Sequence, residues 1–445
     1  MQESNSRFTA DLVIEASWVI PVEPHGNVLE NHAVAISGGN IVAVLPRDEM
    51  NVRCSANETC HLDSHVLIPG LINFHSHAAM TLMRGIADDL KLMDWLSKHI
   101  WPAEARHASA QFVYDGTLLA CAEMLRGGIT CFNDMYFFPE MTARAALDAG
   151  MRAAVGIILI EFPTAYASDA QDYLRKGLAM RDELKHESLL SFCMAPHAPY
   201  TVSDKSFEQV LTLSEQLQIP INTHLHETRD EIRESMAKFG VRPLARLERL
   251  GLLGPNFIAV HAVHLEPAEI ALLARLGCSV AHCPSSNLKL ASGIAPVDRM
   301  LSAGINVGIG TDGAASNNRL DVFCEMRFAA LLAKATSEDA EILPAHTALR
   351  MATLNAAQAL GIEQKIGSIE VGKSADLCAV NLDSIELSPC YDPVSHLIYA
   401  AGREHVSDVW VAGRQLLDSG RILHMDEREI KRKATEWKSR IADSN

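Results

Sequence analysis

Two histidines that follow an apolar segment are the first residues whose types and spacing suggest chemistry. The segment reads PGLINFHSH (residues 69–77), so a predicted buried strand ends in a His-x-His pair. Because side chains alternate across a strand, His75 and His77 leave it on the same side. Two imidazoles that converge at a strand end supply two ligands for a divalent metal ion. The alternative is a polar strand end near solvent, and later residues decide between the two.

Residues that bind metals or transfer protons also follow four later apolar segments, where each of those predicted strands ends. They are His197 after the fourth strand, His224 and Glu227 after the fifth, His261 after the sixth and Asp312 after the eighth. An isolated buried histidine is more often structural, but here such residues follow five of the eight predicted strands. The set therefore predicts one metal centre.

The requirements of a hydrolytic zinc site suggest a role for each residue. Zinc takes three or four protein ligands and keeps a position for water. His75, His77 and His224 can supply neutral nitrogens, and Asp312 can supply an anionic oxygen and accept a proton from the water. Glu227 lies just above the metal, where it could stay protonated near neutral pH and donate to a ring nitrogen or leaving group.

His261 and three further histidines also lie at or near predicted strand ends. His261 could hold the attacking oxygen or polarise the reaction centre. For His226 and His264 we expect supporting or structural roles, because alternation need not hold beyond a strand end. The same expectation applies to His282, which precedes a Cys-Pro pair.

Alternating strand and helix patterns must position these residues. After the strand that bears His75, seven apolar segments are predicted strands: 129–132, 152–160, 190–194, 219–223, 257–260, 278–281 and 305–309. Helical patterns lie between them, for example at 112–126, 205–218, 242–250 and 267–276. Eight strand–helix steps predict a (β/α)8 barrel with its chemistry at the carboxyl ends of the strands. A doubly wound sheet is the alternative, although the first turn lacks a Gly-x-Gly-x-x-Gly loop.

Short alternating strands at both ends of the chain predict a second, smaller domain. Gly38-Gly39 separates two of them and indicates a hairpin, and a matching pattern returns after residue 366. We expect residues 1–67 and 366–445 to build a small β-sandwich domain, with a terminal helix at the end. Residues 68–365 would then form the barrel.

Two missing patterns narrow the metal chemistry. Zinc deaminases of the cytidine type use His-x-Glu followed by Pro-Cys-x-x-Cys. His264-Leu265-Glu266 matches only the first element, so we interpret that match as chance. Two-metal barrels of this kind usually carry a bridging lysine after the fourth strand, where this chain has MAPH (residues 194–197). One metal ion is the better hypothesis.

Composition limits the remaining function classes. The 445 residues are 48% hydrophobic and 21% charged, as in ordinary globular proteins. The net charge of −16 argues against a nucleic-acid partner. The first residues lack a signal-peptide pattern, no apolar run approaches the ~18 residues of a membrane span, and the ten cysteines form no Cys-x-x-Cys pair. We therefore expect a cytoplasmic protein without membrane contact, and apolar loops make a homo-oligomer plausible.

Several longer motifs resemble a known family. They are HSHAAMTLMRG (75–85), MDWL (93–96), SSNLKLASG (285–293), GTDGAASNN (310–318) and GSIEVGKSADL (367–377). Across nearly the whole chain they resemble the amidohydrolase superfamily, in its single-metal branch of amino-heterocycle deaminases and chlorohydrolases. The pattern is most similar to 5'-methylthioadenosine/S-adenosylhomocysteine deaminases.

The resemblance implies a role for each matched residue. His75, His77, His224 and Asp312 would bind one divalent metal ion, with Zn²⁺ preferred over iron or manganese. Glu104, His197 and Glu227 would contact the substrate, and His261 would lie close to the attacking oxygen. A carboxylate such as Glu104 suits two ribose hydroxyls, and Trp95 could stack on the adenine or the 5'-substituent. An exposed helix acid and a core tryptophan are the alternatives for these last two residues.

The implied reaction is hydrolytic deamination at C6 of an adenine nucleoside, which releases ammonia and the inosine analogue. Glu227 would protonate N1, while His261 and Asp312 would stabilise and deprotonate the oxygen. The nearest alternative function is deamination or dechlorination of another ring, such as guanine or an s-triazine. Glu104 argues against this alternative, because such rings carry no diol for its carboxylate to bind. A catalytically silent, metal-bearing scaffold is the alternative from another class.

One departure concerns the tail of the substrate. A family member that acts well on S-adenosylhomocysteine would offer a cation to the amino-acid carboxylate. After the third strand this chain has IEFPTAYA (160–167), with no arginine before Arg175. The sequence therefore favours the neutral methylthio nucleoside.

Overall fold

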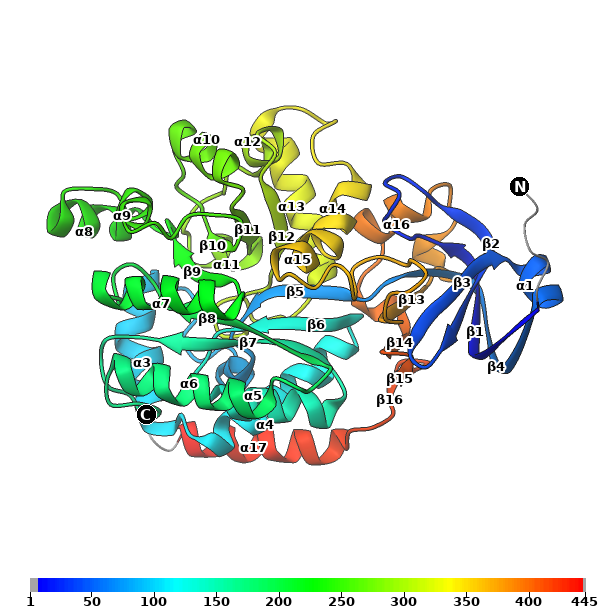
Figure 1. The fold of residues 1–445 in the computed structure, drawn as a ribbon, viewed down its shortest axis with the longest axis horizontal. Helices are drawn as coiled ribbons and strands as arrows, with labels where there is room; N and C mark the ends of the chain where they lie inside the picture. Colours follow the sequence, from blue (N-terminus) through cyan, green and yellow to red (C-terminus); the bar gives the residue numbers. More distant parts are fainter. Residues whose placement is uncertain (1–6, 443–445) are drawn as a thin grey trace.

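A barrel of eight parallel strands forms the centre of the computed structural model, which describes residues 7–442 (Figure 1). In hydrogen-bonded order the strands are β5 (Leu71–Ser76), β6 (Ile129–Asp134), β7 (Arg152–Leu159), β8 (Leu190–Pro196), β9 (Ile221–Leu225), β10 (Phe257–His261), β11 (Ser279–His282) and β12 (Asn306–Ile309). Nearly all their residues are buried, as in parallel strands that are covered on both faces. The predicted barrel is confirmed, and each predicted strand is present.

The first and last strands of the barrel meet at a hydrogen-bonded seam. The Asn73 amide donates to Thr311 Oγ1 at 2.7 Å, and the Thr311 backbone N–H donates to Asn73 Oδ1 at 2.9 Å. Gly310 lies so close to β5 that a Cβ there would be 2.7 Å from the backbone nitrogen of His75. The Asp312 N–H also donates to the His75 carbonyl at 3.0 Å. The seam therefore brings the end of β12 against His75.

Helices alternate with these strands and cover the outside of the barrel (Figure 1). They are α4 (Ala110–Leu125), α5 (Pro139–Ala149), α6 (Ala170–Leu184), α7 (Asp204–Leu217), α8 (Arg229–Phe239), α9 (Pro243–Arg249), α10 (Pro267–Leu276), α11 (Pro284–Lys289), α12 (Val297–Ser302), α13 (Val322–Ser337), α14 (Ala345–Met351) and α15 (Leu354–Ala359). Ser109, Asp169, Ser203 and Thr228 cap helix N-termini through side-chain oxygens.

A helical insertion after β5 separates the first strand from its outer helix α4. It contains the 3-10 turn η1 (Ala78–Met83), α2 (Leu92–Trp95), the π-helical turn η2 (Leu96–Ile100) and α3 (Trp101–His107). Trp95 ends α2, and Glu104 lies in the middle of α3. Glu104 therefore lies in a helical segment after the first strand, as the sequence predicts.

Both ends of the chain build a second eight-stranded sheet, as predicted. Its strands, in hydrogen-bonded order, are β16 (Arg421–Ile422), β15 (Arg414–Asp418), β14 (Val406–Val411), β13 (Leu377–Asn381), β4 (Cys54–Pro69), β1 (Phe8–Val19), β2 (Leu29–Ser37) and β3 (Asn40–Pro46). Gly38 and Gly39 form the predicted hairpin, with the positive φ angles of 56° and 80° that such a turn needs. The boundaries at 67/68 and 365/366 stay predictions.

The remaining helices are α1 (Arg47–Arg53), η3 (Ile385–Leu387), α16 (Pro393–Tyr399), η4 (Arg403–His405) and α17 (Glu427–Ala442). Helix α1 contacts strands of this sheet, whereas α16 packs against α13 and α14 of the barrel. Helix α17 follows β16 and runs back along α4 of the barrel (Figure 1). Residues 1–6, on which the signal-peptide expectation partly rests, and 443–445 lie outside the described residues. Within residues 7–442, no helix combines the length and apolar character of a membrane span.

Candidate metal centre

Imidazole nitrogens and one carboxylate converge at the carboxyl end of the barrel. One nitrogen or oxygen from each of His75, His224, His261 and Asp312 lies within 4.8 Å of the others, and all four residues are buried. His77 joins them, with its Nε2 3.1 Å from Asp312 Oδ1. The structure therefore brings together the four predicted ligands and adds His261 to their immediate surroundings.

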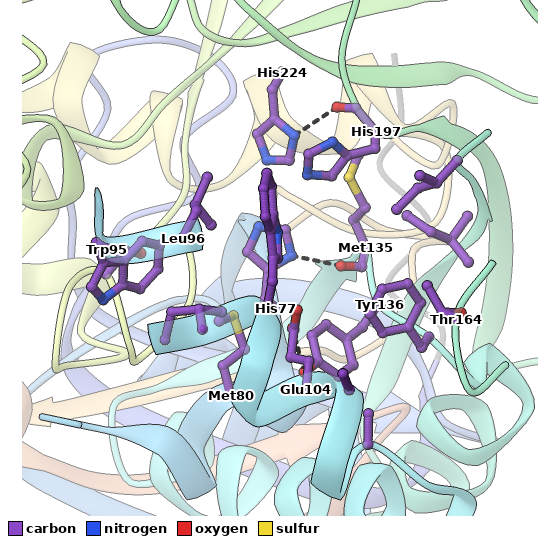
Figure 2. Close-up of a pocket in the computed structure, with 18 of the residues that line it drawn as sticks. His77, Met80, Trp95, Leu96, Glu104, Met135, Tyr136, Thr164, His197 and His224 are labelled. Atoms are coloured by element: carbon purple, nitrogen blue, oxygen red, sulfur yellow. Dashed lines mark hydrogen bonds between the residues drawn. The ribbon is translucent and has the colours of Figure 1, made fainter. Parts of the chain in front are cut away.

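The outer nitrogens of three histidines are already hydrogen-bonded to oxygen atoms. Nδ1 of His77 and His224 lies 2.5 and 2.7 Å from the backbone oxygens of Met135 and His197 respectively, as Figure 2 shows, and Nδ1 of His261 lies 2.9 Å from Asn287 Oδ1. An oxygen acceptor requires the proton on Nδ1, so the lone pair of each Nε2 is left for the interior of the cluster. This is how metal-binding histidines are usually oriented.

The facing nitrogens give a direct test of whether a metal ion fits. Nε2 of His224 lies 3.2 Å from Nε2 of His75, so two lone pairs point at one another unless a proton or a cation separates them. Both side chains are buried, which prevents water from relieving this contact freely. Borderline nitrogen donors beside one hard carboxylate oxygen form a donor set that suits a single zinc-like ion.

Asp312 is fixed with one carboxylate oxygen inside the cluster. Its Oδ2 accepts hydrogen bonds from the hydroxyls of Ser286 at 2.6 Å and Ser316 at 2.7 Å. Its Oδ1 is thereby directed toward the histidines. Asp312 and His261 both have left-handed backbone conformations, with φ angles of 60° and 69°. Such conformations are costly for residues other than glycine and gather at functional sites.

Glu227 lies beside the cluster and is held through its backbone. Its Oε2 is 3.9 Å from Nε2 of His261, and burial raises the pKa of the Glu227 carboxyl. The backbone N–H groups of His226 and Glu227 donate to the two carboxylate oxygens of Glu231 at 3.1 and 2.9 Å. Glu231 is itself buried, so it fixes the turn that presents Glu227.

A cavity of about 500 Å³ opens from the cluster toward solvent (Figure 2). All nine predicted site residues except His75 line it: His77, Trp95, Glu104, His197, His224, Glu227, His261 and Asp312. His197 has its ring centroid 4.9 Å from that of His224. Trp95 and Tyr136 lie on opposite sides of the pocket in Figure 2. The predicted substrate contacts and the predicted ligands therefore belong to one site.

Glu104 is half-buried at the wall of this cavity, and it is not an exposed helix acid. The hydroxyl of Tyr136 donates to Glu104 Oε1 at 2.7 Å, which leaves Oε2 available to a ligand. Burial raises the pKa of Glu104 to about 7. Trp95 is buried, and it both lines the cavity and packs in an apolar cluster with Met80 and Ala103.

The cavity wall carries negative charge and apolar surface. Among the described residues that line it, the charged side chains are the acids Glu104, Glu227 and Asp312, with no lysine or arginine. The loop after β7 contributes Phe162, which is 42% exposed and packs edge-to-face with Trp101. Arg175 pairs with Asp172 on α6 and is not part of the wall.

The other histidines lie outside the cavity lining. His226 accepts a hydrogen bond from the Leu244 N–H through Nε2, and His264 has its Nε2 2.8 Å from the Ser292 carbonyl. His282 is buried, and burial lowers its pKa to about 3. The contacts of His226 and His264 support structural roles, which stay predictions for all three histidines.

Five supporting residues were not predicted. They are Tyr136 beside Glu104, Ser286 and Ser316 beside Asp312, Asn287 beside His261, and Glu231 behind Glu227. Ser286, Asn287 and Ser316 lie within the motifs at 285–293 and 310–318, where their polar character was the available signal. Tyr136 follows β6 among apolar residues, and nothing in its spacing pointed to Glu104.

Comparisons with known proteins agree on the family. The model of the amidohydrolase family matches residues 66–416. The 5-methylthioadenosine/S-adenosylhomocysteine deaminase of Saccharophagus degradans is 46% identical over 98% of this chain and 98% of its own. The crystal structure of an adenosine deaminase from Xanthomonas campestris with bound zinc has a TM-score of 0.97 and 51% identity, over 98% of this chain and 100% of that one. Zinc-bound atrazine chlorohydrolase from Arthrobacter aurescens has a TM-score of 0.88 and 26% identity, over 96% and 99% of the two chains.

Proposed function

This chain belongs to the amidohydrolase family, and we propose that it is a metal-dependent deaminase of adenine nucleosides. It converts 5'-methylthioadenosine to the inosine analogue and ammonia, with adenosine and S-adenosylhomocysteine as further candidate substrates. The observation that carries this proposal is the cavity that joins the half-buried His77 and the buried Asp312 to Glu104. The full-length similarity to a 5-methylthioadenosine/S-adenosylhomocysteine deaminase supports the same activity.

The proposed metal ligands are His75, His77, His224 and Asp312. The inward-facing Nε2 atoms and the fixed Asp312 Oδ1 support this set, and the zinc in two similar structures supports zinc as the ion. When bound, zinc supplies the Lewis acidity that makes water nucleophilic near neutral pH. His261 is the adjacent group that hydrogen-bonds the attacking oxygen.

Proton transfers by the chain's own residues complete the proposed reaction. The buried Glu227 carboxyl donates its proton to N1 of the purine as water adds to C6. Asp312 accepts a proton from the attacking oxygen, and His261 stabilises that oxygen. Asp312 then passes its proton to the amino group, and the C6–N bond breaks as ammonia leaves. The remaining hydroxyl proton returns to Glu227 as the C6 carbonyl forms, so one water is consumed and one ammonia is released. The raised pKa of Glu227 supports its role as the acid.

The cavity wall would bind the rest of the nucleoside. Glu104 accepts hydrogen bonds from the two ribose hydroxyls, His197 contacts the purine and Trp95 covers it. A volume of about 500 Å³ is within the usual range for a pocket that binds a small molecule. The apolar wall around Phe162, which lacks a cation among the described residues, favours a neutral methylthio tail over a charged amino acid.

Ammonia release from a panel of substrates tests the proposal. The panel contains 5'-methylthioadenosine, adenosine, S-adenosylhomocysteine, adenine, guanine and a chlorinated s-triazine. We expect the adenine nucleosides to be the best substrates by kcat/KM. Preference for guanine or the triazine would favour the second candidate, which the likeness to atrazine chlorohydrolase supports. Stoichiometric metal without any turnover would favour a silent scaffold.

We also propose a cytoplasmic location. All ten cysteines are free thiols in the structure, which supports a reducing compartment. Cell fractionation tests this location, and recovery in a secreted fraction would contradict it.

The oligomeric state can be measured by size-exclusion chromatography with light scattering. A homo-oligomer would have a measured mass that is a multiple of the 48.6 kDa of one chain.

A further inference from the structure

The C-terminal helix α17 packs against η1 and α4, the elements that precede and follow the segment carrying Glu104, although its chain comes from the second sheet. After β16 the chain crosses to the barrel, and α17 contacts α4 and η1 (Figure 1). Its polar residues 431–433 point largely to solvent, whereas Trp437 and Ile441 are only 6% and 5% exposed. The helix is therefore docked at both ends, through Ile430 in its first turn and through Trp437 and Ile441 in its last turns.

Trp437 makes one hydrogen bond and one aromatic contact with α4, and the Arg440 guanidinium of its own helix lies 4.7 Å from its ring centroid. Its Nε1–H donates to Asp115 Oδ2 at 2.8 Å, and its ring meets Phe112 edge-to-face at 5.2 Å between centroids. Asp115 Oδ1 also accepts from the Gln111 amide at 2.8 Å. Gln111, Phe112 and Asp115 all lie in the first two turns of α4. Because α4 begins at Ala110 and α3 ends at His107, Trp437 anchors the helix that directly follows α3.

The contact reaches the cavity through a continuous apolar cluster. Trp437 and Ile441 belong to the same buried cluster as Trp95, Ala103 and Tyr136. Ala103 precedes Glu104, and Tyr136 donates the hydrogen bond that fixes the Glu104 carboxyl. The helix thus supports Glu104 from two directions, through the junction of α3 with α4 and through the packing of Tyr136.

We propose that α17 positions the nucleoside-binding segment 92–107, and that Trp437 is the positioning residue. The inference rests on the proposed function only in naming Glu104 as the ribose contact. The mechanical coupling between Trp437 and residues 92–107 does not depend on the substrate. Trp437 acts through Glu104 and is not itself a catalytic residue, so its loss should affect substrate binding more than the chemical step.

Steady-state kinetics test the functional part with the full chain. Trp437→Phe keeps an aromatic ring, although a smaller one, and removes the N–H donor, and Asp115→Asn changes the acceptor. We expect KM for the adenine nucleoside to rise about fivefold in each, with kcat and bound metal near the wild-type values. In a Glu104→Gln background the same substitutions should leave KM unchanged. An equal KM increase in that background would overturn the proposal. Lys438→Ala, on the exposed face of α17, is the matched control.

Hydrogen exchange tests the coupling without any substrate. In Trp437→Phe and in the larger truncation Trp437→Ala, amides of residues 92–107 should exchange faster while β7 and β8 keep their protection. Unchanged exchange of this segment in both variants would overturn the proposal. If the wild-type protein deaminates no adenine nucleoside but the exchange difference is present, the proposed function fails and the positioning role of α17 stands.

Discussion

Asp312 Oδ1 lies 3.1 Å from His77 Nε2, although the two residues follow the last and the first strands of the barrel. This contact depends on the seam at which Asn73 and Thr311 exchange two hydrogen bonds. The metal centre is therefore built where the first and last strands of the barrel meet. A change that opens this seam should also separate Asp312 from His77.

Metal removal should affect stability as well as activity. We expect about one metal ion per chain, and a chelator should lower the Tm because the folded state alone holds the assembled ligands. His77→Ala and Asp312→Asn should purify with little metal. Elemental analysis and thermal unfolding measure both effects, with the exposed His424→Ala as the control. Full metal content in Asp312→Asn would refute its assignment as a ligand.

The two hydroxyls on Asp312 Oδ2 should matter for metal binding. Ser286→Ala and Ser316→Ala each remove one donor, so the carboxylate loses part of its fixed orientation. We expect metal affinity or kcat to fall about 10-fold or more in each variant. Metal titration of the apo-protein measures the first effect. Ser285→Ala, whose hydroxyl makes no contact with Asp312, serves as the control, and wild-type affinity in both test variants would contradict the prediction.

Replacing Glu227 by Gln should separate chemistry from metal binding. The amide keeps the shape of the side chain and its backbone contacts with Glu231 but cannot transfer a proton to the purine. We expect kcat to fall by roughly 10² to 10⁴, with bound metal unchanged. Near-normal turnover would show that another group is the acid.

The pH dependence of substrate binding should report on Glu104. Burial raises the pKa of Glu104 to about 7, so at lower pH its carboxyl is largely protonated and can accept fewer hydroxyl donors. KM for an adenine nucleoside should therefore decrease as pH rises through about 7. Glu104→Gln should have a higher KM without this pH dependence. With the wild-type enzyme, a 2',3'-dideoxy nucleoside should likewise have a higher KM that lacks this pH dependence.

The apolar wall should discriminate between substrate tails. We expect kcat/KM for 5'-methylthioadenosine to exceed that for S-adenosylhomocysteine by at least about 10-fold, because the second tail carries a carboxylate that meets no cation. Phe162→Arg places a guanidinium at the rim and should narrow this ratio, whereas Phe162→Leu should not. A strong preference of the wild-type protein for S-adenosylhomocysteine would reject the prediction.

The barrel and its ligands could be predicted because their signals are local. Buried parallel strands appear as apolar runs, and a residue such as His224 or Asp312 follows its strand directly. The partners of these residues could not be found in that way. Tyr136 meets Glu104, and Trp437 meets Asp115, only because separate elements pack together. The left-handed φ of His261 likewise depends on its surroundings in the fold.

The seam between β5 and β12 also joins residues that are synthesised at very different times. His75 is synthesised 237 residues before Asp312 (312 − 75). At roughly 5–20 residues per second, about 12 to 47 s pass between them on the ribosome. During that interval His75 and His77 exist without the carboxylate that completes their site. The complete set of proposed ligands, with its one carboxylate, therefore exists only after the last barrel strand has been synthesised.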